Sequence, residues 1–561
     1  MRGTWLVMTG MMLLAGAVAG TAQEHEHPDR EHGMAMATAD SSAGDRTPLY
    51  DNLGTYHMAI TTASPVAQRY FDQGIRLTYG FNHDEAIKAF REGAREDSTC
   101  AMCWWGVAYA LGPNINVPMD TAAVAPAWEA LRQAVRLAPK AGPRNQAYIR
   151  ALQARYSPVP AAGRASLDSA WSKAMGQVSR RYPKDDDAAT LYAESLMDLR
   201  PWNYWSNAGK PRAPSTLETV AVLERIVKRR LDHPGACHFY IHAIEASTFA
   251  ARAVPCAERL GSLEPGAGHL VHMPTHIYMR LGWWDDAVDH NAHAVQVDQE
   301  YLAARHPTGV YPIGYVPHNY HVMWEALSML GRSEEALSAA RTIADKVPAD
   351  VVRMIPPFEY FSPVVLFTLA RFSRWDDILK EPAPPADLRY TTGIWHYARG
   401  LAFAARGALD SAAVEWDSVA AIAEKIPPEA PANLNSQRVL LQIGERHLAG
   451  DLAARRGQTG DAVKALREGI ALEDELTYDE PTAWVLPLRQ PLGAILLAAG
   501  RPREAEQAYR EDLVRYPNNG WSLHGLAESL AAQGRAKEAA AVDAQFRKVW
   551  SRADVKPLAA M

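Results

Sequence analysis

The sequence has no long block of like charge, no long alternating stretch and, beyond its N-terminus, no apolar run that could span a bilayer. Its net charge is −6, and the absence of a basic face argues against nucleic-acid binding. A membrane-spanning helix needs about 20 apolar residues, so we expect no membrane span in the mature chain. Strict alternation of apolar and polar residues marks a half-buried strand, and its absence argues against a sheet.

Several catalytic signatures are also absent. There is no HExxH sequence, so a zincin-like protease is not indicated. GxSxG, P-loop and Rossmann fingerprints are missing too. The CAMCW sequence is not followed by histidine, which excludes a c-type haem attachment site.

The N-terminus has the pattern of a secretory signal peptide. Arg2 is followed by an apolar stretch from Trp5 to Ala19, and the small residues that come next would allow cleavage after Ala19 or Ala22. The run is too short for a membrane anchor. We therefore expect residues 1–22 to be removed and the mature protein to be periplasmic or secreted.

Residues 23–49 are predicted to form a flexible leader. This segment is rich in small and polar residues and contains the following histidines and methionines: His25, His27, His32, Met34 and Met36. Such a tract can hold copper or zinc. A solvated linker without a role explains the same composition, and both interpretations stay open.

Four cysteines occur in the 561 residues. An even number in an oxidising compartment predicts disulfides, and three pairings can be drawn. Proximity in the sequence favours Cys100 with Cys103 and Cys237 with Cys256. The Cys100–Cys103 spacing would also suit a redox dithiol, but the strand-then-helix context of a thioredoxin-like site is missing, which favours a structural disulfide.

One pattern recurs along most of the chain. A small residue is followed twelve positions later by another and four positions further by a bulky residue, as in Gly493, Ala505 and Tyr509. Proline often closes the unit, and the 34 residues from Ala505 to Ala539 give the period. Small residues allow two antiparallel helices to cross closely, and bulky ones fill the space between pairs. Further units contain these residues: Gly74, Ala86 and Phe90; Ala287; Ala336; Gly400 and Ala412; Gly450 and Ala462.

This spacing resembles the tetratricopeptide repeat (TPR), and about eight to ten units fit it between residues 65 and 550. The segments FDQGIRLTYGFNHDEAIKAF, CAMCWWGVAYALGPNIN, CHFYIHAIEAS and HLVHMPTHIYMRLG also resemble a group of bacterial exported TPR proteins with a histidine-rich centre. That likeness implies no particular activity. The TPR resemblance implies an all-α solenoid of stacked antiparallel helix pairs, with a peptide or protein partner bound in its concave groove.

On this basis we divide the chain after the leader into three regions. Residues 50–233 form an N-terminal TPR-like helical region, residues 234–348 the central histidine-rich units, and residues 349–561 a C-terminal TPR region. The chain has 19 histidines, and ten of them fall between His238 and His321. Several are three or four positions apart, which places them on one face of a helix.

The repeat register predicts that this face lines the groove. We fixed the register of three units on Pro265, Ala287 and Ala336 rather than on histidine. Seven imidazoles then point into the groove: His238, His242, His269, His272, His276, His318 and His321. Glu245 and Glu325 occupy groove positions of the first and third units. His290 and His293 fall on a second helix, where they would be either outer-shell or structural residues.

Imidazoles that converge from separate helices are how proteins hold zinc, copper or iron. We therefore expect a transition-metal site, with one metal or with two metals a few ångströms apart. An enzyme is compatible with this set, with the metal activating water or oxygen and Glu245 or Glu325 as ligand or general base. The alternatives are a metal-free groove that binds a peptide or protein, and a pH sensor.

Overall fold

The computed structural model describes residues 46–158 and 163–557. The predicted signal peptide and almost all of the predicted leader lie outside the described residues. The regular secondary structure of these residues is helical, apart from one isolated bridge and a hairpin of β1 (Pro431–Ala432) and β2 (Asn435–Ser436). The expected all-α fold is confirmed. No helix of the described residues has the length and apolar character needed to cross a membrane.

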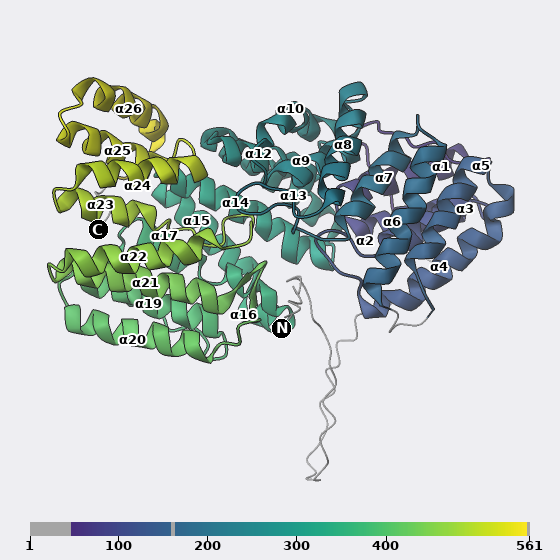
Figure 1. Cartoon of the computed structure of the whole chain (residues 1–561). Coiled ribbons are helices and arrows are strands. Elements are labelled where there is room, and N and C mark those ends of the chain that lie inside the picture. Colours follow the sequence, from purple (N-terminus) through teal and green to yellow (C-terminus); the bar gives the residue numbers. More distant parts are fainter. Residues whose placement is uncertain (1–45, 159–162, 558–561) are drawn as a thin grey trace, which may run out of the picture.

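Successive helices form antiparallel pairs that stack along the chain (Figure 1). The N-terminal pairs are α1 (Pro65–Tyr79) with α2 (His83–Glu96), α3 (Ala101–Ala110) with α4 (Val124–Leu137), α5 (Pro143–Leu152) with α6 (Arg164–Arg181), and α7 (Asp186–Met197) with α8 (Pro214–Arg229). The middle pairs are α9 (Pro234–Ile244) with α10 (Val254–Leu263), α11 (Gly268–His272) and α12 (Pro274–Leu281) with α13 (Trp284–Arg305), and α14 (Val316–Met329) with α15 (Ser333–Lys346).

The C-terminal pairs follow the short helix α16 (Ala349–Met354). They are α17 (Val364–Arg371) with α18 (Trp375–Lys380), α19 (Arg389–Ala405) with α20 (Leu409–Lys425), α21 (Gln437–Arg455) with α22 (Thr459–Asp474), α23 (Arg489–Ala498) with α24 (Pro502–Arg515), and α25 (Gly520–Ala532) with α26 (Ala536–Val549). Twelve pairs occur in the described ranges, more than the eight to ten expected, because short and irregular pairs escape the spacing rule.

Glycine–aromatic packing explains the repeat spacing. The ring of Tyr509 on α24 lies against Gly493 of its own pair and Gly525 of the next. A Cβ atom added at Gly493 would meet the ring at 2.5 Å, and one added at Gly525 would meet it at 2.2 Å. Phe90 lies in the same way between Gly74 and Gly106. A bulky residue thus fills the gap between successive pairs, and the TPR-like α-solenoid is confirmed.

The solenoid folds back on itself. The indole of Trp521 on α25 donates to the backbone oxygen of Ser328 on α14 at 2.9 Å, and Trp284 on α13 donates to the Pro517 oxygen at 2.8 Å. The loop between α22 and α23, residues 475–488, reaches the middle pairs as well, because the Tyr478 hydroxyl lies 3.2 Å from a Glu245 oxygen. The middle pairs are therefore covered by C-terminal elements instead of lining an open groove.

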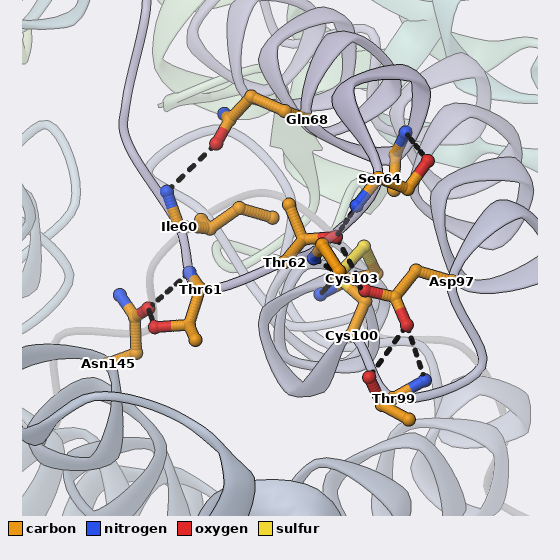
Figure 2. Close-up of a disulfide and its surroundings, with 12 residues drawn as sticks. Ile60, Thr61, Thr62, Ser64, Gln68, Asp97, Thr99, Cys100, Cys103 and Asn145 are labelled. Atoms are coloured by element: carbon orange, nitrogen blue, oxygen red, sulfur yellow. Dashed lines mark hydrogen bonds between the residues drawn. A yellow bond between two sulfur atoms is a disulfide. The ribbon is translucent and has the colours of Figure 1, made fainter.

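The four cysteines lie as two pairs, Cys100 with Cys103 and Cys237 with Cys256. Figure 2 shows the first pair at the start of α3, where Cys103 donates its backbone N–H to the Cys100 sulfur at 3.1 Å. Both of these cysteines are fully buried, which suits a structural bridge. The second pair joins α9 to α10 within one repeat, next to His238.

Candidate metal centre

Six histidines from three successive repeats meet in the interior. His238 and His242 lie one turn apart on α9, His269 and His272 on α11, His276 on α12, and His318 on α14. Only Met273 separates α11 from α12, and its right-handed helical backbone keeps the α11 and α12 histidines on one side. Neighbouring rings have centroids 4.6 to 6.5 Å apart. The imidazoles therefore form one contiguous cluster.

The first triad consists of His238, His242 and His269, which offer nitrogens within 4.8 Å of one another. The Nδ1 atom of His238 lies 2.6 Å from the backbone oxygen of Tyr79, and that of His242 lies 2.8 Å from Glu245 Oε1. Each Nδ1 must carry the proton to donate to an oxygen, which leaves the Nε2 lone pair free. Among the described residues these two Nε2 atoms, and both nitrogens of His269, have no hydrogen-bond partner.

The second triad consists of His272, His276 and His318, which also offer nitrogens within 4.8 Å of one another. The Nε2 atom of His272 lies 2.8 Å from that of His276 and 3.2 Å from that of His318. The Nδ1 atom of His272 lies 2.6 Å from Asn291 Oδ1, and the Asn291 amide is fixed by a bond to the Ala287 oxygen. Three Nε2 atoms thus face one small region.

Two carboxylates hold the outer nitrogens. His276 Nδ1 lies 3.1 Å from Glu245 Oε2 and 2.8 Å from Glu480 Oε2. Since Glu245 also binds His242, one carboxylate links a histidine of each triad. The Tyr478 hydroxyl lies 3.0 Å from Glu480 Oε1, so the 475–488 loop completes this outer layer. Histidines that bind metals commonly donate their other ring nitrogen to a carboxylate or backbone oxygen in this way.

Burial keeps most of these rings neutral. It lowers the pKa of His242 and of His318 to about 3, and the pKa values of His238, His269 and His272 well below the usual range for histidine. Neutral imidazole is the form that binds a metal. For His276 burial again lowers the pKa, but Glu480 and Glu245 outweigh it and raise the value to about 10.

Two aromatic residues with left-handed backbones pack on the first triad. Phe81 (φ 56°) has its ring 4.5 Å from that of His238, and Trp202 (φ 61°) has its ring 5.1 Å from that of His242. Such conformations cost about 1–3 kcal/mol in residues other than glycine and persist where the surroundings enforce them. The two rings thus shield the triad from solvent.

A cavity adjoins both triads and encloses about 650 Å³ of empty space, including its mouth. His242, His269 and His318 reach its wall, together with Glu480. The rest of the wall is mostly aromatic or apolar, with two amides and the carboxylate of Asp479. Its lining includes Trp202, Tyr315, Phe358, Tyr360, Phe361, Asn116 and Asn433. A small molecule in this cavity would lie directly against the histidines.

The structure does not bring His321 or Glu325 into either triad. The His321 ring contacts Trp324, Tyr360 and Phe361, with centroids 5.1 to 5.4 Å away. Glu325 accepts from the backbone N–H of Thr482 at 3.1 Å, while its other oxygen has no hydrogen-bond partner in the described part of the chain.

The repeat pattern did not identify the residues that hold the outer nitrogens of the histidines, Asn291 and Glu480. His290 and His293 lie toward the surface of α13, and the residue between them that faces the cluster is Asn291. The only indication of Asn291 in the sequence is a polar side chain at a position on the buried face of that helix. Glu480 lies in a loop far along the chain, and nothing in the repeat pattern pointed to it.

No protein-family model matches the sequence, and no curated protein matches it either. Among solved structures, the APC/C hetero-tetramer Cut9–Hcn1 aligns over 83% of this chain and 76% of that chain, with 12% identity and a TM-score of 0.30. The human IFIT1 dimer with m7Gppp-AAAA aligns over 87% and 91%, with 12% identity and a TM-score of 0.34. Yeast Tom70 aligns over 86% and 99%, with 11% identity and a TM-score of 0.28. TM-scores this low give no support to the fold assignment. The helix pairs and the glycine–aromatic packing of the chain itself identify its fold as a TPR-like α-solenoid.

Proposed function

We propose that this protein binds a transition metal, copper, zinc or iron, through buried histidines at the base of the aromatic cavity. The observation that carries the proposal is that the two nitrogens of a ring have different roles in His238 and in His242. His238 and His242 bind oxygens through Nδ1 and leave Nε2 without a partner. A buried polar atom without a partner costs about 1–3 kcal/mol, and a metal ion would remove that cost.

The burial of the rings supports a metal over a groove-bound peptide. The five histidines of the cluster on α9, α11 and α12 are at most 3% exposed. A peptide that used them as donors or stacking surfaces would need open ring faces along a groove. Access through the cavity suits a small molecule better.

If the centre is catalytic, Glu480 is the candidate general base. It is the one carboxylate in contact with the histidines that also lines the cavity, as far as the described residues extend. Burial and the neighbouring Glu245 raise its pKa to about 7, although His276 lowers it. A value near the working pH is what a general base needs. Glu245 instead holds two histidines and serves as a positioning residue.

We further propose that the protein is exported and receives its metal in an oxidising compartment. The N-terminal pattern of residues 1–22 and the two cysteine pairs both support this placement. Fractionation of cells that express the full-length chain tests it. Recovery of the intact, uncleaved chain in the cytoplasm would contradict export.

Metal analysis of the purified protein tests the metal proposal. The leader residues His25, His27, His32, Met34 and Met36 are first replaced by alanine, so that the leader offers neither imidazole nor thioether to a metal. We expect stoichiometric metal in this parent and a loss in His272→Ala/His276→Ala. The matched control is His290→Ala/His293→Ala on the neighbouring helix, which should keep its metal. A folded parent that takes up no copper, zinc or iron on reconstitution would overturn the proposal.

A further inference from the structure

We infer that the centre holds two metal ions side by side, one in each histidine triad. This inference rests on the proposed function and specifies the stoichiometry and layout of the site. The nitrogens of His238, His242 and His269 form one set within 4.8 Å, and those of His272, His276 and His318 form another, with no member in common. A third set, His242 with Glu245 and Glu480, shares its one histidine with the first set, and its carboxylates hold outer Nδ1 atoms of the rings. A single ion with three or four ligands would occupy one set and leave the other unused.

The two sets lie next to each other. The ring of His242 in the first triad is 5.4 Å from that of His276 in the second, and the ring of His269 is 5.6 Å from that of His272. Ions in neighbouring sets of this kind would be close enough to act on one small molecule. The cavity wall contains histidines of both triads, which gives such a molecule access to both ions.

Each triad has its own outer support, which a single-ion site would not need. His238 is held by the Tyr79 backbone oxygen, and His272 by the Asn291 amide. Glu245 then serves both triads, because its two oxygens lie near His242 Nδ1 at 2.8 Å and His276 Nδ1 at 3.1 Å. These contacts fix ring orientation in both sets.

The second triad needs only a small adjustment to take an ion. Nitrogens about 2.0–2.1 Å from one tetrahedral ion are about 3.3 Å apart. In the structure the corresponding distances are 2.8 Å between His272 and His276 and 3.2 Å between His272 and His318. Two ring nitrogens that face each other at such distances need a proton or a cation between them.

The charges favour copper(I) as the occupant. Glu245 and Glu480 are the carboxylates within reach of the triads in the part of the chain that the structure describes. Two monovalent ions would be balanced by these two carboxylates, whereas two divalent ions would leave a buried charge of +2. Imidazole binds copper well, and copper(I) is monovalent.

Copper(I) titration of the parent with the leader histidines and methionines replaced, kept reduced with ascorbate, tests the inference. We expect two equivalents in the parent and one in each of His238→Ala/His242→Ala and His272→Ala/His276→Ala. Binding of one equivalent of copper(I) by the parent would overturn the inference of two ions and leave the proposed function standing. No copper, zinc or iron in a folded parent would overturn both. His269→Gln and His318→Gln, which keep more side-chain volume, repeat the comparison if an alanine variant fails to fold.

A second readout tests whether the ions are neighbours. The same proteins are loaded with copper(II), with hydroxide from the solvent to balance the added charge of the divalent ions, and the electron paramagnetic resonance intensity is compared with the copper content. Two adjacent ions couple, so the parent should give less signal than its copper requires, while each single-triad variant gives the full signal. A full, uncoupled signal from a parent with two coppers would overturn the side-by-side arrangement.

Discussion

Glu245 Oε2 lies 3.1 Å from His276 Nδ1, although the two residues belong to successive repeats. The other oxygen of the same carboxylate holds His242 in its own repeat. One fully buried side chain therefore sets the orientation of rings in both triads. This relationship separates Glu245 from Glu325, which the repeat register had placed in an equivalent role.

Replacement of Glu245 by glutamine should weaken metal binding about 10- to 100-fold, as the loss of outer-shell partners does in other metal sites. The amide cannot accept from both rings and leaves one Nδ1–H without its partner. Affinity is measured by competition with a chelator. Glu325→Gln is the matched control, since Glu325 is 2% exposed but binds the Thr482 backbone instead of a histidine. Equal losses in the two variants would show that Glu245 acts only through general stability.

Removal of the Cys237–Cys256 pair should loosen α9 and α10 before the rest of the chain. The two cysteines are 19 positions apart, and a closed loop of that length contributes about 3 kcal/mol in the chain-entropy description. Hydrogen exchange of residues 234–263 in Cys237→Ser/Cys256→Ser measures the local change. Cys100→Ser/Cys103→Ser removes a pair that closes a loop of only three positions in another repeat, and it should leave this region protected. Unchanged exchange in the first variant would contradict the expectation.

A methyl group at Gly493 should destabilise the C-terminal repeats by about 1–3 kcal/mol, the usual cost of overpacking. The added Cβ would meet the Tyr509 ring at 2.5 Å. Gly460→Ala at the start of α22 is the control, because nothing lies within 4 Å of its added Cβ and its backbone is not left-handed. Urea unfolding compares the two. A Gly493→Ala protein as stable as Gly460→Ala would mean that the close crossing is not required.

Asp298 should make stability fall as the pH rises from about 4 to 7. Burial raises the pKa of this carboxyl to about 7, although Tyr311 and Asn319 lower it by hydrogen bonds. The folded protein keeps the proton up to that pH, while the unfolded chain releases it near the ordinary aspartate pKa of 3.8. The free energy of unfolding then declines by up to about 1.4 kcal/mol per pH unit in this window and is level above it.

Asp298→Asn removes this titration, so its unfolding free energy should lose that slope between pH 4 and 7. Asp289→Asn, an exposed position on the same helix, should keep it. The measurement is denaturant unfolding at four or five pH values on the metal-free proteins, which separates the effect from metal loading. Parallel curves for parent and Asp298→Asn would show that the carboxyl is already ionised in the folded state.

The fold could be predicted because its determinants are local. Each pair is specified by small and bulky residues within about one repeat, as Gly493, Ala505 and Tyr509 illustrate. The same register, fixed without any histidine, placed six of the seven predicted imidazoles in the cluster. His321 differs because the 3-10 helix Pro356–Phe361 packs against it, and the repeat pattern does not describe that helix.

The closure of the groove could not be predicted from spacing. It depends on contacts between distant repeats, such as Trp521 with Ser328 and Tyr478 with Glu245. A register assigns a face to each helix but gives no information on what covers that face. The 475–488 loop is not part of a helix pair, so the repeat register that identified the histidines could not identify Glu480.

The reach of the 475–488 loop also determines when the centre can be assembled as the chain emerges into the compartment where it folds. Repeat solenoids fold mainly through nearest-neighbour contacts and can therefore fold from the N-terminus as the chain emerges. The six histidines would emerge early, but Tyr478 is 233 positions after Glu245. A nascent chain that ends before this loop would carry the ligands without Glu480 or the cover. The finished histidine cluster therefore depends on completion of the polypeptide, since a truncated product would lack the carboxylate of Glu480 and the covering loop.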